Sequence, residues 1–214
     1  MKSPFLTLAS SYGAPYEVMK IALDICGNEL LHLTNDSGAT VLHSGIKAPL
    51  DRLKLFLACS SEQLNKREVF LMKVGGYSPL QYAIVRGATI EEVKLFIEYG
   101  GKEVLMQRDG CHGRTSLQLA MHCGGSAEVL KLLISSGGEE LVSKNDKYGV
   151  AVLDYFIHQR NNLRYNATVM EKKEILTMLL ETTSFEEYGA GLFRPYELSG
   201  MNEIVISIEV NGTR

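Results

Sequence analysis

A self-similar pattern that returns about every 37 residues is the feature that most constrains this chain. Five short apolar segments align on leucines that are separated by steps of 36, 38, 37 and 36 residues. These anchor leucines are Leu6, Leu42, Leu80, Leu117 and Leu153. Near-equal steps of this length are typical of arrays in which each repeat is one small unit that covers its neighbour.

A second segment follows each anchor and has the pattern of an amphipathic helix. It starts with an acidic residue, where the dipole of a helix favours negative charge. Apolar residues then recur three and four positions apart, which is the helical period. The five segments are residues 17–23, 51–57, 92–97, 128–134 and 174–180. Each repeat is therefore predicted to hold a short inner helix and a longer outer helix.

Glycines mark the joints of the predicted unit. Gly13, Gly87 and Gly124 fall between the two helices of their repeats, where a tight turn requires positive φ. A second set lies four residues before the anchors and follows polar clusters: Gly38, Gly76, Gly113 and Gly149. Since one such unit cannot bury its own apolar face, stacking of the units creates the core.

These residues resemble ankyrin repeats. The family pattern Gly-x-Thr-Pro-Leu-His-x-Ala is matched in pieces at 38–43, 76–83 and 113–120, and the resemblance extends over about residues 3–182. It implies an all-α solenoid of about five helix pairs with β-turn or loop fingers. The family period is about 33 residues, so we place the extra residues in an elongated loop at 100–107. The predicted domain covers 1–184, with repeats at about 3–36, 37–74, 75–111, 112–147 and 148–184.

The two ends depart from the pattern, as terminal repeats do. Repeat one starts without a finger and is predicted to cap the N-terminal end. Repeat five carries a polar insertion at 160–166, after which Thr168 and Glu171 predict a capping box that opens the last helix. Residues 185–214 form a C-terminal tail in which alternation over 204–210 is typical of a β-strand. A loosely ordered tail or the remnant of a further domain is the alternative.

Charge and composition exclude several classes of function. The net charge of −3 and the absence of a basic stripe argue against nucleic-acid binding. No apolar run has the length of a signal peptide or a membrane span. The four cysteines are irregularly spaced and do not suggest a disulfide framework. We therefore expect an intracellular, cytoplasmic location, with the nucleus left open.

No pattern for catalysis is found. The chain lacks a phosphate-binding glycine loop and a local nucleophile signature. Cys111-His112 and His122-Cys123 superficially suggest zinc, but adjacent side chains diverge and do not converge on one tetrahedral centre. We expect no enzyme activity and no cofactor. A metal-binding or enzymatic protein that uses these positions and the tail remains an alternative, and self-association through the tail is a third.

The ankyrin resemblance implies a protein–protein interaction module or adaptor that binds another protein or an extended peptide. In the family, the fingers and the exposed ends of the inner helices line a concave groove. The predicted partner-binding residues are Tyr12, Lys47, Tyr77, Val85, Arg86, Arg108, Asp109, Arg114, His122 and His158. Tyrosine and arginine are enriched in interface hot spots, so the cluster of Tyr77, Arg86, Arg114 and His122 is expected to contact an acidic or mixed partner. Alanine at Tyr77, Arg86 and Arg114 is expected to abolish binding without changing stability, and the chain is expected to be a monomer.

Overall fold

The computed structural model describes residues 5–46, 49–61, 66–158 and 168–183. All regular elements in these ranges are helical, apart from one isolated antiparallel bridge between Val74 and Tyr77. The prediction of an all-α class is confirmed.

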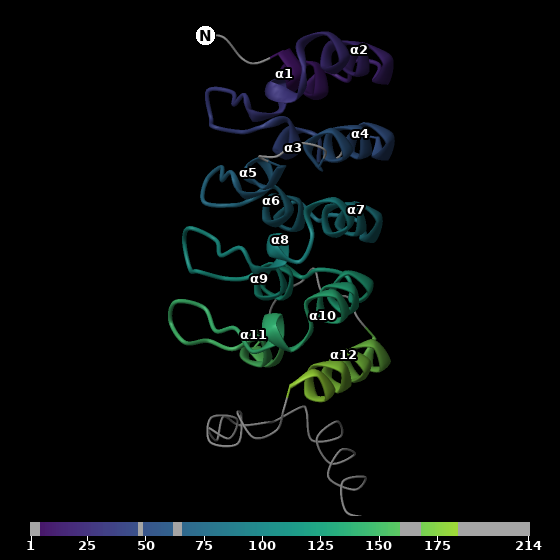
Figure 1. Ribbon diagram of the computed structural model, residues 1–214. Coiled ribbons are helices and arrows are strands. Elements are labelled where there is room, and N and C mark those ends of the chain that lie inside the picture. Colours follow the sequence, from purple (N-terminus) through teal and green to yellow (C-terminus); the bar gives the residue numbers. More distant parts are fainter. Residues whose placement is uncertain (1–4, 47–48, 62–65, 159–167, 184–214) are drawn as a thin grey trace, which may run out of the picture.

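The helices form two columns that run the length of the stack (Figure 1). The inner column holds α1 (Phe5–Ser11), α3 (Val41–Ser44), α6 (Pro79–Val85), α9 (Ser116–Cys123) and α11 (Val152–His158). The outer column holds α2 (Tyr16–Cys26), α4 (Leu50–Ser61), α7 (Ile90–Gly100), α10 (Ala127–Val142) and α12 (Val169–Thr182). Long loops project from the inner column on the side away from the outer helices, and these loops are the predicted fingers.

A third, short helical segment follows the outer helix in four repeats. These segments are η1 (Asn28–His32), α5 (Lys66–Leu71), α8 (Glu103–Met106) and the part of α10 beyond Gly138. The prediction that residues 100–107 form an elongated loop is therefore wrong. The segment is helical because its apolar residues enter the core: Leu31, Phe70, Leu105 and Val142 are all buried. In repeat three, α8 packs against α7, α9 and α10.

Two glycine pairs allow the outer helix to turn into this third segment. The second glycine of each pair has positive φ, 71° at Gly101 and 61° at Gly138, which glycine adopts without a steric penalty. The first glycine leaves room for the helix that follows. A Cβ on Gly100 would lie 2.5 Å from Cγ1 of Val104, and a Cβ on Gly137 would lie 2.5 Å from Cβ of Leu141.

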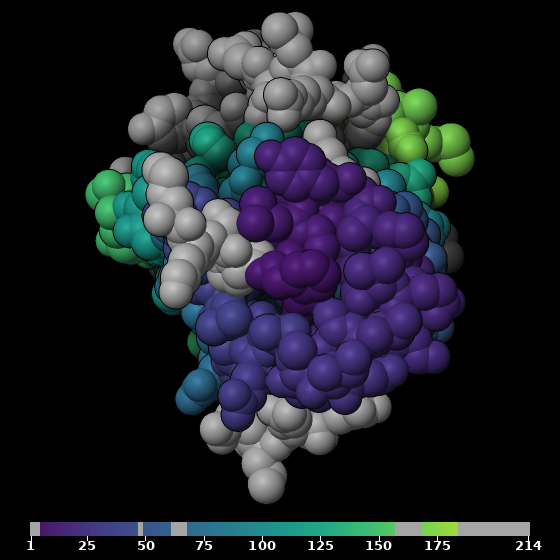
Figure 2. Space-filling model, turned by 90° about the horizontal axis from the view of Figure 1, so that it is seen from above, coloured from purple at the N-terminus to yellow at the C-terminus, as the bar shows by residue number. Residues whose placement is uncertain are grey.

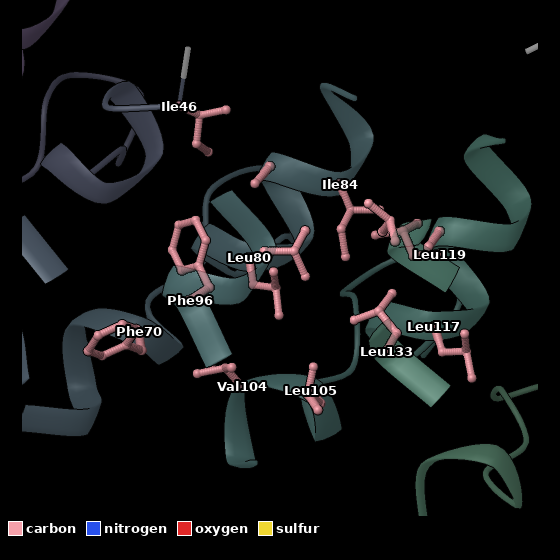
Figure 3. Packing of buried hydrophobic residues seen from close by; sticks show 14 of the residues in the cluster. Ile46, Phe70, Leu80, Ile84, Phe96, Val104, Leu105, Leu117, Leu119 and Leu133 are labelled. Carbon is pink, nitrogen blue, oxygen red and sulfur yellow. The ribbon is translucent and has the colours of Figure 1, made fainter. Parts of the chain in front are cut away.

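The core runs continuously through the stack. The anchor leucines of the first four repeats are buried and Leu153 is half-buried. Figure 3 shows how side chains from α6 to α10 gather in one cluster, with Leu80, Phe96 and Leu105 supplied by three different helices. Each fully buried side chain of this kind stabilises the fold by about 1.5–3 kcal/mol. Stacking therefore creates the core, as the repeat pattern predicted.

Glutamines at one repeat position link the inner helices α6 and α9 to the finger that follows. Gln81 accepts a hydrogen bond from the Ser78 N–H (3.1 Å) and donates to the carbonyl oxygens of Gln107 (2.8 Å) and Arg114 (3.2 Å). One repeat later, Gln118 donates to the carbonyls of Lys144 (2.9 Å) and Val150 (3.0 Å). The same side chain thus caps its own helix and anchors the finger beyond it.

The capping box predicted for the last helix is confirmed. The Thr168 N–H donates to Glu171 Oε2 (2.6 Å), and the Glu171 N–H donates to Thr168 Oγ1 (3.2 Å). The predicted insertion at 160–166 and the tail at 185–214 lie outside the described residues. The strand in the tail therefore stays a prediction.

Candidate partner-binding face

Three of the described fingers are held by the side chain with which they begin. Asp109 Oδ1 accepts hydrogen bonds from the N–H groups of Cys111 (3.0 Å), His112 (2.6 Å) and Gly113 (3.0 Å). Asp146 and Asn35 bond the backbone of their own fingers in the same way. This local turn chemistry explains why a polar residue starts these loops.

Asp109 and Arg114 form a buried ion pair, with Nε of Arg114 2.6 Å from Oδ2 of Asp109. Burial alone raises the pKa of Asp109, but the backbone N–H donors and Arg114 outweigh it and lower the pKa overall. Burial likewise disfavours the Arg114 cation, and Asp109 outweighs that effect, so the pKa of Arg114 is raised. Both groups are therefore charged, and each neutralises the other.

The expectation that Asp109 and Arg114 present their side chains to a partner is wrong. Arg114, one residue past the finger glycine, turns inward because the carboxylate of Asp109 is its counter-ion. The same carboxylate also organises the turn. Alanine at Arg114 would leave a buried carboxylate without its cation and would destabilise the fold by about 3–5 kcal/mol. The predicted triple variant with Tyr77, Arg86 and Arg114 would therefore not leave stability unchanged.

Exposed cations join neighbouring fingers. Lys73 Nζ donates to the carbonyl oxygen of Arg108 (2.7 Å). Arg108 Nη1 in turn donates to the carbonyls of Gly113 and Asn145 (2.7 Å each). Lys147 Nζ donates to the carbonyl of Cys111. Among the charged side chains that the structure describes, no carboxylate forms an ion pair with any of these three cations.

Aromatic and basic side chains extend the same face over the inner helices. Arg86 Nη2 donates to the Tyr82 hydroxyl (2.8 Å), and the guanidinium carbon lies 5.2 Å from the centre of that ring. The rings of His122 and Tyr155 meet edge to face, with centroids 6.2 Å apart. The sequence prediction missed Tyr82 and Tyr155, which share one repeat position two residues after the anchor leucine. That shared position is the signal that could have found them.

Electrostatics set the charge states in the middle of this face. Burial lowers the pKa of His122, the charges of Arg114 and His112 lower it further, and Asp109 opposes them. Burial and the hydrogen bond to Asp146 Oδ2 (2.8 Å) raise the pKa of Tyr155 above its usual range. At neutral pH His122 is uncharged and Tyr155 keeps its proton. The positive charge of the face therefore comes from lysine and arginine.

The remaining predicted residues are spread along the stack. Arg86, Arg108 and His122 are exposed, and Tyr77 and Val85 are half-buried. Tyr12 is exposed at the far N-terminal end, after α1. Lys47 lies outside the described residues, as does the side chain of His158, the last residue of α11. Tyr77 and His122 thus lie near the same buried side chain, Arg114, with which each interacts electrostatically, whereas Tyr12 lies in the first repeat.

The positions considered for zinc lie on two different elements. Cys111 and His112 are on a finger, whereas His122 and Cys123 end α9. In the ranges that the structure describes, no three histidine, cysteine or acidic side chains gather as metal ligands would. All four cysteines are free thiols. No described helix is both long enough and apolar enough to cross a bilayer.

A stack of helix pairs with hairpin fingers defines a helical repeat protein, a class that presents an extended surface. The family model of ankyrin repeats (three copies) matches residues 50–146. This part of the chain belongs to the ankyrin repeat family, and the helix pairs before and after it continue the same stack (Figure 1). A search of curated proteins finds no match.

Proposed function

We propose that this protein is a non-catalytic binding module, and that its fingers and inner helices bind an acidic segment of a partner protein. We call the proposed surface the finger face and define it by Lys73, Tyr77, Tyr82, Arg86, Arg108, His122 and Lys147. Ankyrin repeats are generally protein–protein interaction modules, which supports a protein as the partner. The free thiols are consistent with action in the reducing cytoplasm.

The charge of the fingers carries the proposal. Lys73, Arg108 and Lys147 bond to neutral carbonyl oxygens, so their positive charges are not cancelled. The acidic residues Asp109 and Asp146 of the same fingers are buried and satisfied internally. Solvent therefore meets cations along the fingers of the third to fifth repeats. An acidic partner would supply the missing counter-charges and would be steered toward this face.

Aromatic residues next to these cations suit a protein chain rather than a free anion. Tyr77 and Tyr82 are half-buried, so they offer ring surface without a large loss of side-chain freedom. Arginine and tyrosine together are the residue types that dominate binding energy at interfaces.

Charge reversal tests this proposal. The test variant carries Arg86→Glu and Lys147→Glu on the finger face, and the control carries Lys54→Glu and Lys94→Glu on the exposed surface of α4 and α7. Both variants change the net charge by the same amount. A partner captured from cell extract by the unaltered protein is identified by mass spectrometry, purified and titrated against all three forms.

The finger-face variant is expected to bind at least about tenfold more weakly, with the control unchanged. Binding of the unaltered protein should also weaken as salt is added. Equal affinities for the two variants would show that the finger face is not the binding surface.

A further inference from the structure

The fingers at 109–113 and 145–149 are joined to one another directly. The Lys147 N–H donates to the carbonyl oxygen of His112 (3.0 Å). The side chain of Lys147 crosses to the same finger, where Nζ donates to the carbonyl oxygen of Cys111. The tips of the two fingers are therefore held together by a backbone bond and a side-chain bond.

Two cations are held at the tip that contains His112. Arg108 Nη1 donates to the Gly113 carbonyl oxygen (2.7 Å), and Lys147 Nζ donates to the Cys111 carbonyl oxygen. The Cα atoms of Cys111 and Gly113 are no more than about 7 Å apart, because the two residues are two positions apart in the chain. Both cationic groups therefore lie at the same fingertip, on either side of the exposed His112.

Tyr148 adds an aromatic ring to this group. The ring meets that of His112 edge to face, with centroids 6.0 Å apart, and its centre lies 5.0 Å from Nζ of Lys147. We call Arg108, His112, Lys147 and Tyr148 the junction cluster, and all four residues are exposed. Figure 2 looks down the stack, and the teal and green fingers of the later repeats project past the purple first helix pair. The cluster is therefore accessible to a ligand.

The exposed groups of the junction cluster are positively charged. Among the described side chains, no carboxylate forms an ion pair with Arg108 or Lys147. The nearby Asp146 is buried, and its carboxylate accepts hydrogen bonds from the Val150 N–H and from the Tyr155 hydroxyl. A ligand that approaches the fingertips therefore meets the two cations before it meets this carboxylate.

Both cations also keep donors for a ligand. A guanidinium has five N–H groups and an ammonium has three. The carbonyl oxygens of Gly113 and Asn145 take two of those of Arg108, and that of Cys111 takes one of those of Lys147. Three donors on Arg108 and two on Lys147 therefore have no acceptor among the residues that the structure describes.

We propose that the junction cluster binds a phosphorylated serine or threonine side chain within the acidic segment of the partner. This inference rests on the proposed function, because it names one group of the segment that the finger face binds. The cations lie at the surface of the fingertips, where a short phosphorylated side chain reaches them.

The chemistry of a phosphate matches the cluster better than that of a carboxylate. A phosphorylated side chain carries a charge of about −1.5 to −2 at neutral pH and has three acceptor oxygens. It can therefore neutralise both cations and accept from donors on each. A carboxylate has one charge and two oxygens, so it would leave one cation without a counter-charge. Clusters that contain arginine are a recurring way to recognise phosphorylated peptides.

The test uses three fluorescent peptides that differ only at a central residue, which is phosphoserine, serine or glutamate. Each peptide carries glutamates on both sides of the centre, so all three are acidic. Fluorescence anisotropy follows the binding of each peptide to the full chain. The phosphoserine peptide is expected to bind at least about tenfold more tightly than the other two, because it adds charge-assisted hydrogen bonds. Inorganic phosphate should displace it only at a far higher concentration, because phosphate alone makes none of the contacts of the flanking glutamates.

Lys147→Gln is the test variant, and Lys94→Gln, which removes an exposed cation of α7, is the matched control. Circular dichroism and urea unfolding check that both variants are folded. In the test variant the preference for phosphoserine over serine is expected to fall from about tenfold to about threefold or less. The control is expected to keep the full preference.

Equal binding of the phosphoserine and glutamate peptides would overturn the inference and leave the proposed acidic partner in place. An unchanged preference in the folded Lys147→Gln protein, or the absence of binding by all three peptides, would also overturn it. Displacement by inorganic phosphate at the concentration of the peptide would show a site for the free anion instead. The charge-reversal titration with the captured partner uses none of these peptides, so it decides the proposed function separately.

Discussion

At the scale of single residues, His43 makes the hydrogen bonds that glutamine makes in the next two repeats. The Thr40 N–H donates to His43 Nδ1 (3.3 Å), so the neutral ring carries its proton on Nε2. The Nε2–H group donates a hydrogen bond to the Tyr77 carbonyl oxygen (3.2 Å). Gln81 and Gln118 make the equivalent bonds with one amide group. In repeat five Asp154 accepts a hydrogen bond from the Ala151 N–H (3.0 Å). An ionised carboxylate cannot donate, so this residue cannot make the bond to a finger carbonyl that the glutamines make.

His43→Gln should remove an acid sensitivity of the fold. Burial lowers the pKa of His43, and the bond to the Tyr77 carbonyl only partly opposes this. The unfolded chain, with a histidine pKa of about 6.5, therefore takes up this proton first as pH falls. The stability that neutral His43 contributes is complete above that pH and is lost progressively below it.

Urea unfolding at pH 7.5 and at pH 5 measures the effect. Near neutral pH the variant should match the unaltered protein within about 1 kcal/mol, because glutamine keeps both bonds. At pH 5 the variant should be the more stable of the two. An identical loss of stability in both proteins would assign the acid sensitivity to other groups.

At the scale of elements, the third helical segment is what the sequence did not predict. The anchors, the outer helices and the glycine turns were visible because their patterns recur over many residues. Segments such as Glu103–Met106 span about one turn, too short for a helical period to emerge. Their signal is instead a repeated triplet, an acidic residue followed by two apolar ones, as in Glu29-Leu30-Leu31 and Glu103-Val104-Leu105.

The candidate site was predicted in part for a similar reason. Repeat register located Arg86 and His122 at the ends of the inner helices, where the structure has them exposed. Register could not show that Arg114 turns inward, because that depends on the Asp109 carboxylate, five positions earlier. Nor could it show that Lys73 and Arg108 reach the next finger, a contact between residues 35 to 37 positions apart.

Gly137→Ala should destabilise the junction between the outer helix and the third segment. The added methyl group would lie 2.5 Å from Leu141 Cβ, an atom that cannot rotate away. Forced packing of this kind costs about 1–3 kcal/mol. Ser136→Ala, one residue earlier in the same helix, is the control and should change stability by less than about 0.5 kcal/mol.

Thermal and urea unfolding of both variants provides the measurement. Full stability of the Gly137→Ala protein would mean that the third segment is not packed over this glycine.

At the scale of the whole molecule, the exposure of one repeat position differs between the first repeat and the second. Val41 opens α3 and is covered by repeat one, whereas Phe5 opens α1 and is half-exposed. The helical repeat fold makes the two positions equivalent in every other respect.

Aspartate at these two positions should therefore have very different effects. Val41→Asp buries a charge without a partner and is expected to destabilise the protein by about 3–5 kcal/mol. Phe5→Asp leaves its charge in water and should cost about 1 kcal/mol or less. Urea unfolding of the two variants compares them. Equal losses would mean that repeat one does not cover Val41 as the structure indicates.

The bonds from Lys73 and Arg108 to the neighbouring finger have a consequence for affinity. Loops that must be immobilised by a ligand give up conformational entropy when it arrives, and that loss is subtracted from the binding free energy. Here the loops are tied to one another before any ligand is present, at 2.7 Å and through side chains that keep their full charge. Folding has thus already fixed much of the conformation of the fingers, so a ligand loses less free energy in ordering them. A short peptide can therefore gain useful affinity from a small number of contacts.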